Sequence, residues 1–112
     1  MNYKKLRGYQ RQEKLSKSQL ALLPDTFYDE VQEYCKEVKA NEEYDLLKNV
    51  YAITNLIKEV RLQKLFNKSA YYVHHNVNLD EVKDIQNILP VEVEMFTEVL
   101  KVLYKYDQET KL

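Results

Sequence analysis

The sequence predicts an all-α fold, a five-helix bundle arranged around one long central helix. Three observations lead to this prediction. A single Gly and two Pro among 112 residues leave too little turn chemistry for a protein made of hairpins. Apolar residues recur three and four positions apart in most segments, as one face of a helix requires. The stretch from Asn41 to about Tyr72 contains neither Gly nor Pro.

The longest predicted helix spans approximately 41–73. Asn41 is a good N-cap, and acidic side chains in the first turn suit the positive end of a helix. About thirty helical residues form a rod of roughly 45 Å, whereas a compact domain of this length has a radius of gyration of only ~13 Å. Because the remaining helices are shorter, we expect part of this rod to stay uncovered and to meet another chain.

Two predicted helices precede the rod. The first covers residues 2–15, and a short turn capped by Ser16 or Ser18 follows it. Pro24 ends that turn, because the residue before a proline is pushed out of the α region. Asp25 or Thr26 then caps the second helix, about 26–40.

Two more helices follow the rod. Asp80 is expected to cap a short helix that ends near Asn87, and Pro90 is expected to open the last helix, where its missing N–H costs nothing. We expect one helical domain over residues 1–106 and a frayed polar tail over 107–112.

Composition limits the possible functions. The chain is 45% hydrophobic and 31% charged, which is typical of a folded domain, and no apolar run approaches the length of a membrane span. It lacks an N-terminal signal segment, and its single cysteine, Cys35, permits no internal disulfide. We therefore expect a cytoplasmic protein. Without Gly-rich phosphate loops or a recognisable nucleophile–base pair, we also expect no cofactor and no catalysis.

Charge is strongly segregated along the chain. Residues 1–24 carry six basic side chains and one acidic one, whereas residues 25–45 carry two basic and eight acidic. Such blocks can orient neighbouring subunits. The alternative interpretation is a helical nucleic-acid-binding module that uses the basic first helix, within residues 1–17, together with the basic stretch Lys58–Lys68.

Two further clusters raise the question of a metal site. The adjacent pair His74 and His75 lies near Asp80 and Glu81. Helical metal ligands are usually three or four residues apart, so the histidines are better explained as the end of the long helix. The scattered carboxylates of the second helix are better explained as a solvated face, and we expect no metal.

Arg61 is the one charged residue singled out on the long helix. It lies among apolar positions, where a guanidinium must have its donors satisfied if it is buried. We expect a structural ion pair with a carboxylate of the second helix (Glu30, Glu33 or Glu37) or of a partner chain. A surface arginine whose stem lies along the helix is the open alternative.

Three stretches resemble the GINS family, whose members form a tetrameric replication factor. Leu20–Val38, LALLPDTFYDEVQEYCKEV, resembles the family's segment in which a Phe-Tyr pair precedes a later Tyr. Ile57–Ala70, IKEVRLQKLFNKSA, resembles the element in which an Arg is followed three residues later by Lys and then by Leu or Ile. Asn87–Leu103, NILPVEVEMFTEVLKVL, resembles the closing helix of archaeal members.

The resemblance implies the helical domain of the helical-domain-first class, and with it a structural role in DNA replication. Its expected partners are a paralogous GINS subunit and a second copy of the chain, in a dimer or heterotetramer. The MCM replicative helicase and a RecJ-like factor follow by resemblance, with DNA contact indirect or weak and a location near the nucleoid. The small C-terminal β domain of the family is absent from this sequence, so no activity of that domain is expected.

The partner interface is expected on the outer half of the long helix. Large apolar side chains gather there, and ten tyrosines in the chain favour protein contacts. The residues predicted to meet the partner are Leu62, Leu65, Phe66, Tyr71 and Tyr72.

Overall fold

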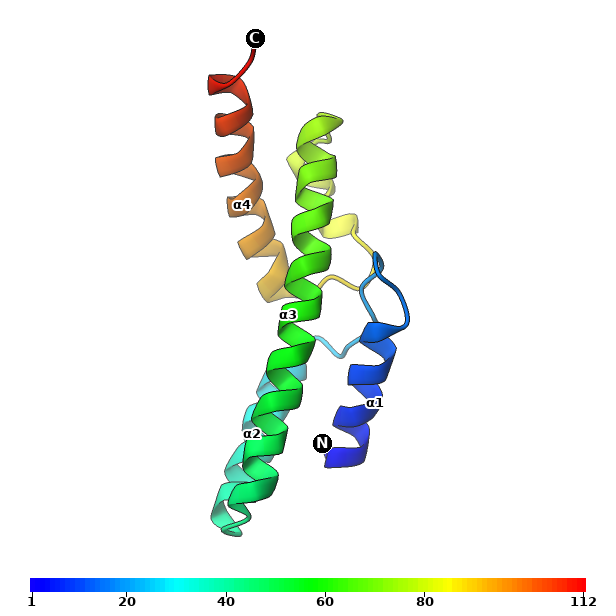
Figure 1. Ribbon diagram of the computed structural model, residues 1–112, viewed down its shortest axis with the longest axis vertical. Coiled ribbons are helices and arrows are strands. Elements are labelled where there is room, and N and C mark those ends of the chain that lie inside the picture. Colours follow the sequence, from blue (N-terminus) through cyan, green and yellow to red (C-terminus); the bar gives the residue numbers. More distant parts are fainter.

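The computed structural model describes residues 1–112 and confirms the all-α prediction with five helices (Figure 1). None of them combines the length and the apolar character needed to cross a membrane. Their bounds are α1 Tyr3–Lys14, α2 Phe27–Ala40, α3 Tyr44–His74, the 3₁₀ helix η1 Leu79–Asp84, and α4 Pro90–Glu109.

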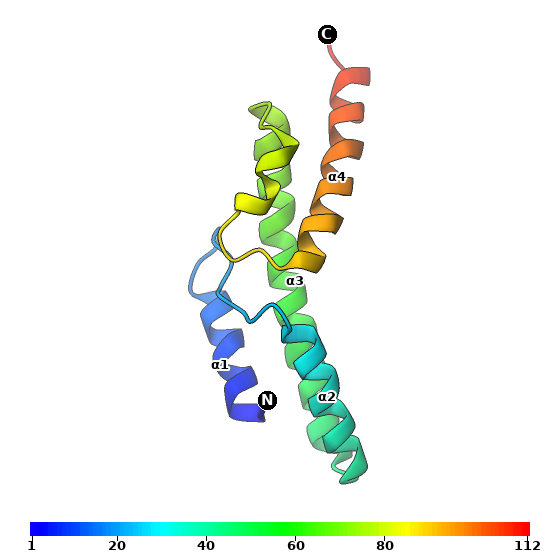
Figure 2. The same cartoon turned by 180° about the vertical axis from the view of Figure 1, so that it is seen from behind.

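The molecule is an elongated rod built on α3. Its principal extents are 59 × 23 × 21 Å and its radius of gyration is 16.7 Å, well above the ~13 Å of a compact domain of this size. α1 and α2 flank the first half of α3, while η1 and α4 flank the second half (Figures 1 and 2). Each half of the rod is therefore covered on only part of its circumference.

This arrangement divides the interior into two apolar cores. The first, which we call the α1–α2 core, is built from α1, α2 and the first half of α3, and the second, the α4 core, from α4, η1 and the second half of α3. Ile57 belongs to the first and Leu65 to the second. The α1–α2 core consists of Leu6, Leu23, Phe27, Val31, Val50, Ile53, Ile57 and Leu89, and the α4 core of Leu20, Leu65, Val82, Phe96 and Leu100.

The two connecting segments cross between the cores. Leu20 follows α1 in sequence but packs in the α4 core, and Leu89 immediately precedes α4 but packs in the α1–α2 core. Both side chains are almost completely buried. The halves of the rod are thus interlocked by the connections as well as joined through α3.

Several helix boundaries differ from the prediction. Asn41 ends α2, and α3 begins only at Tyr44, because Glu42 adopts a φ of 56° and the chain turns tightly between the two helices. Asn78, rather than Asp80, caps η1: its side-chain oxygen accepts a hydrogen bond from the Asp80 N–H at 3.0 Å. α4 continues to Glu109, three residues beyond the expected boundary.

The segment between α1 and α2 forms no helix. Its local order comes from Ser16, whose hydroxyl oxygen accepts hydrogen bonds from the N–H groups of Ser18 and Gln19. The expected cap at Ser16 is therefore present, but it closes a turn without a helix after it. Backbone carbonyls of this segment that bond to no helix accept hydrogen bonds from the charged side chains described below.

Two leucines that are three residues apart on α3 should differ in their contribution to the free energy of unfolding, because one is buried and the other is exposed. Leu65→Ala removes a side chain that is 2% exposed and should reduce the free energy of unfolding by about 2–5 kcal/mol. Leu62→Ala changes a side chain that is 41% exposed and should cost less than about 1 kcal/mol. Urea denaturation followed by circular dichroism measures both, and equal losses would contradict the two-core packing.

Candidate functional site

The guanidinium of Arg61 lies buried between the two cores. It forms two hydrogen bonds with the Glu92 carboxylate, from Nε at 2.8 Å and from NH2 at 2.7 Å. NH1 donates to Glu13 Oε1 at 2.7 Å and to the carbonyl of Ala21 at 3.0 Å, and NH2 also donates to the carbonyl of Asn87 at 2.9 Å. Only 1% of its side chain is exposed.

Lys64 lies about one turn further along the same face of α3. Its ammonium group donates to the Glu13 carboxylate and to the Glu13 carbonyl, both at 2.6 Å, and to the carbonyl of Gln19 at 2.8 Å. Glu13 is therefore held by two cations, one on each of its carboxylate oxygens. We call the set of Arg61, Lys64, Glu13 and Glu92 the Arg61 network.

Helix ends place the two carboxylates of the Arg61 network. Glu13 is in the last turn of α1, and its Oε2 also accepts the Ala21 N–H at 3.0 Å. Glu92 is in the first turn of α4, where its Oε1 accepts the Leu89 N–H at 2.9 Å and so caps that helix. A carboxylate at a helix N-terminus also gains from the helix dipole.

The Arg61 network is closed. A guanidinium has five N–H donors and an ammonium three, and the five bonds of Arg61 and three of Lys64 use all of them. No buried side-chain nitrogen or oxygen lacks a partner. Because neither cation has a donor left for a ligand, this buried cluster holds the fold together and is not a binding site.

The Arg61 ion pair differs from the sequence-based expectation. The carboxylates of α2 (Glu30, Glu33 and Glu37) do not reach it, so the expected partner was wrong. The physical reason is that α2 runs away from the start of α4 along the first half of α3 (Figure 2), whereas Glu13 in the last turn of α1 and Glu92 in the first turn of α4 both reach Arg61. The open alternative, a surface arginine, is also excluded by its burial.

Competing effects set the ionisation of Glu13 and Arg61. Burial raises the pKa of Glu13, but hydrogen bonds from Lys64, Ala21 and Arg61 outweigh it, and the pKa falls below 4.5. Burial likewise lowers the pKa of Arg61, but the carboxylates of Glu92 and Glu13 outweigh it and raise the pKa above its ordinary value. Both groups are therefore charged throughout the neutral range.

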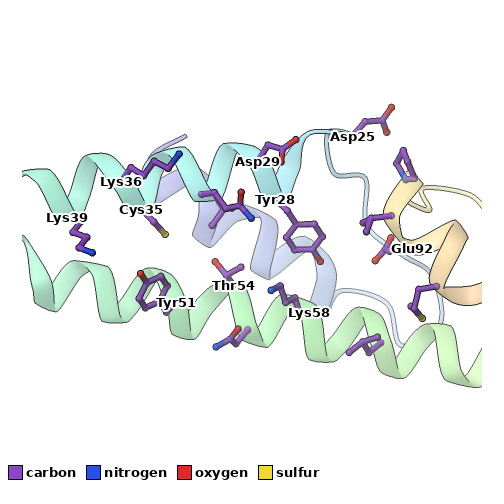
Figure 3. Close-up of a pocket in the computed structure, with 17 residues that line it drawn as sticks. Asp25, Tyr28, Asp29, Cys35, Lys36, Lys39, Tyr51, Thr54, Lys58 and Glu92 are labelled. Atoms are coloured by element: carbon purple, nitrogen blue, oxygen red, sulfur yellow. The ribbon is translucent and has the colours of Figure 1, made fainter.

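A groove of about 1030 Å³ opens between α2, α3 and the start of α4 (Figure 3). Tyr28 of α2 points across it toward α3, and the Lys58 ammonium lies 5.4 Å from the centre of that ring. Lys36 and Lys39 line one end, and Asp25 lies at the other. The walls are therefore partly apolar, with basic and acidic side chains toward opposite ends.

Tyr28 and Cys35, two titratable residues that line this groove, are held in their protonated forms. Burial, with the nearby charge of Glu92 second, raises the pKa of Tyr28 to about 12, so the phenol stays protonated. Burial also raises the pKa of the Cys35 thiol, which disfavours the nucleophilic thiolate. Cys35 is half-buried and packs against the α1–α2 core. The groove offers contact surface without an activated nucleophile.

The histidine pair lies at the end of α3, as its position in the sequence suggested. His75 caps the helix, and its ring lies 4.2 Å from that of Tyr71 and 5.0 Å from that of His74. No group of three or more His, Cys, Asp or Glu side chains is placed to hold a metal ion.

The five residues expected at a partner interface do not share one surface. Leu65 is buried in the α4 core, and Tyr72 is half-buried with its ring 5.6 Å from that of Phe96. Leu62, Phe66 and Tyr71 are exposed, at 41%, 54% and 58%. At ~100° per residue, Tyr71 projects about 140° away from Phe66, so only Leu62 and Phe66 lie together. The expectation that Leu65 is bare is wrong, because α4 and η1 cover it.

The basic stretch Lys58–Lys68, which a nucleic-acid-binding module would use, does not form an exposed basic surface. Within Lys58–Lys68, Arg61 and Lys64 are buried in the Arg61 network, and Lys68 is half-buried. Lys58 faces the groove. A continuous basic surface on α3 is therefore excluded, and only α1 keeps the exposed cations that the alternative requires.

Sequence reasoning missed Glu13, Lys64 and Glu92 as members of a buried site. Glu13 carried a signal, because it is the only acidic residue among the first 24. Glu92 follows Pro90 in the predicted last helix, where a carboxylate suits the positive helix end, and its second role depends on the distant Arg61. The carbonyls of Gln19, Ala21 and Asn87 give no signal in the sequence.

Compared with protein-family models, with curated proteins and with solved structures, the chain matches none. Its functional interpretation therefore depends on its own surfaces and on the sequence resemblance described above.

Replacing Arg61 should be among the most damaging single changes in the chain. Arg61→Met leaves two buried carboxylates without their shared partner and should reduce the free energy of unfolding by about 3–5 kcal/mol. The free energy of unfolding of Arg61→Lys should lie between those of Arg61→Met and the parent, because the three donors of a lysine cannot satisfy the acceptors that the five donors of Arg61 satisfy. Lys58→Met is the exposed control on the same helix. A urea midpoint of Arg61→Met equal to that of Lys58→Met would contradict this role.

Acid should weaken the fold through Glu13. A carboxyl group whose pKa is lowered on folding stabilises the folded state fully above its unfolded pKa, and the stabilisation is lost as pH falls through the folded value. Unfolding free energy should therefore decline below about pH 4.5. Glu13→Gln should be less stable at pH 7 and should decline less steeply in acid. The control Glu94→Gln, at an exposed position of α4, should show the same dependence of unfolding free energy on pH as the parent. If the curves of the parent and Glu13→Gln were parallel, Glu13 would not be the source of the acid sensitivity.

Proposed function

We propose that the chain is a non-catalytic assembly subunit that binds a second helical chain, either a paralogue or another copy of itself. The sequence resemblance suggests that the assembly is a GINS-like DNA replication complex supporting the MCM helicase, with a RecJ-like factor as a further partner. The observation that carries the assembly role is an exposed apolar surface on α3 and α4.

This surface, which we call the α3–α4 face, follows one stripe on each helix. On α3 it contains Leu62 and Phe66, four residues apart, at 41% and 54% exposure. On α4 it contains Val91, Val102 and Tyr106, whose spacings of eleven and four residues place them on one side of a helix, at 61%, 68% and 64% exposure.

The two stripes adjoin. A small depression between the helices is lined by Leu62 and Phe66 from α3 and by Met95 and Val99 from α4. Met95 and Val99 lie on the same side of α4 as Val91 and Val102. Exposed apolar side chains that adjoin one another across two helices are typical of protein interfaces, so the α3–α4 face favours an assembly role.

The shape of the molecule supports the same role. α3 is 31 residues long, and neighbours cover each half of it on only part of its circumference. Burial of apolar surface contributes about 25 cal/mol per Å², from which the cost of association is subtracted. A long, narrow subunit gains most from lateral contact with another rod, because that contact runs along its length.

The closed Arg61 network adds support for a structural role of the Arg61–Lys64 spacing. In the GINS-like element an Arg is followed three residues later by Lys, and here that spacing places both cations on one carboxylate. A motif with this role maintains the shape of a subunit, and its presence is explained without a bound substrate.

Sedimentation tests the assembly role. The parent, alone and with a candidate paralogue, should form a species larger than the monomer between micromolar and millimolar concentrations. Phe66→Asp combined with Tyr106→Asp places two charges on the α3–α4 face and should weaken that species at least tenfold, because each buried charge is costly. Both residues are exposed, so the variant should keep the parent's circular dichroism.

The matched control is Leu15→Asp combined with Leu22→Asp. Both leucines are more exposed than Phe66, at 76% and 74%, but lie between α1 and α2. This control should sediment like the parent. A strictly monomeric parent under all conditions would refute the proposal, and a complex that survives the first variant but not the control would move the interface to the α1–α2 connection.

A further inference from the structure

The outer side of α1 carries a row of cations without acidic neighbours. Lys4, Arg7, Arg11 and Lys14 are all exposed, and their spacings of three, four and three residues place them along one side of the helix. We call this row the α1 cation stripe. α1 lies at an edge of the molecule with no other helix over its outer side (Figure 1).

No carboxylate neutralises this stripe. The exposed ion pairs of the molecule are on α2 and α4, where Lys36, Lys101 and Lys105 each have a carboxylate three or four residues away. α1 contains one acidic residue, Glu13, and that side chain points inward to Arg61 and Lys64. The helix therefore places its acid inside and its cations outside. Four like charges over eleven residues repel one another, and a bound polyanion would relieve that repulsion.

We propose that the α1 cation stripe binds the phosphate backbone of duplex nucleic acid without reading its sequence. The ten residue steps from Lys4 to Lys14 span about 15 Å, and phosphates follow one another along each strand at ~3.4 Å of axial rise. The stripe thus matches the length of about four consecutive phosphates. No base-reading motif accompanies it, so the contact positions the protein and carries no sequence preference.

The surroundings of the stripe distinguish this partner from an acidic protein or a single strand. Protein interfaces have an apolar centre, whereas α1 itself exposes no large apolar side chain, and the exposed Leu15 adjoins only the C-terminal end of the stripe. Binding of single strands relies on aromatic side chains that stack with bases, yet Tyr3 and Tyr9 are half-buried against the α1–α2 core. The inference concerns α1 alone and does not depend on the α3–α4 face.

Salt dependence of binding is the decisive measurement. Fluorescence anisotropy with labelled duplexes of two unrelated sequences should give equal affinities, and log K against log salt should have a slope of about −3.6 for four phosphate contacts. The association constant should therefore fall about 150-fold between 50 and 200 mM salt. Arg7→Gln combined with Arg11→Gln should halve the slope and reduce that fall to about 12-fold.

A control variant removes the same charge elsewhere. Lys39→Gln combined with Lys48→Gln changes two exposed lysines of α2 and α3 and should keep the parent's slope. Circular dichroism should be unchanged in both variants. Phe66→Asp with Tyr106→Asp should bind duplex with the parent's slope per chain even if assembly is lost, which separates this inference from the proposed function.

Four outcomes would overturn the proposal. The parent could fail to bind duplex at 25 mM salt, or the two variants could lose equal slope, which would indicate a general charge effect. Tighter binding to a single strand than to a duplex would reassign the stripe to unpaired nucleic acid. Displacement of the duplex by polyglutamate at an equal concentration of charge would reassign it to an acidic protein.

Discussion

The Arg61 network is the constraint on which the rest of the structure depends. Two cations on α3, close to the middle of the rod, hold the end of α1, the start of α4 and three backbone carbonyls of the connecting segments. Charges removed from water must be fully compensated, so the elements that supply those partners have little freedom in position. The network separates the two apolar cores, and it explains why the connections cross there: Leu20 and Leu89 reach opposite cores beside Ala21 and Asn87, whose carbonyls bind Arg61.

Much of the fold was predictable because helical periodicity is a local property. The apolar spacing of α3 and the Pro that opens α4 located those helices within three residues of their starts. Helix boundaries were less predictable where they depend on an unusual backbone conformation. Glu42, Asn76 and Asn87 adopt positive φ, and Glu42 has no side-chain preference for that conformation. The distribution of apolar residues around α3 was also ambiguous, because its buried side follows different neighbours in each half.

The candidate site was less predictable, because its geometry joins residues 31 to 51 positions apart. Arg61 was noticed from its apolar surroundings, but nothing local indicates that its partners are Glu13 and Glu92. Solvent exposure was also not predictable from the local sequence. Leu62 and Leu65 look alike there, and only the position of α4 decides that Leu62 is exposed and Leu65 is buried. The α1 cation stripe was evident as composition, but its lack of neutralising neighbours depends on the inward direction of Glu13.

The order of the network's members along the chain has a consequence for biosynthesis. Glu13, Gln19 and Ala21 leave the ribosome first, Arg61 and Lys64 follow, and Asn87 and Glu92 come last. When the chain has emerged through Lys64, Glu13 can neutralise Lys64, but two bonds of Arg61 still lack the carboxylate of Glu92 and the site still lacks the apolar cover of Leu89. We therefore expect the centre of the nascent first half to stay hydrated until the beginning of α4 arrives. Completion of the fold therefore waits for the start of α4, although most residues of the first core are synthesised well before it.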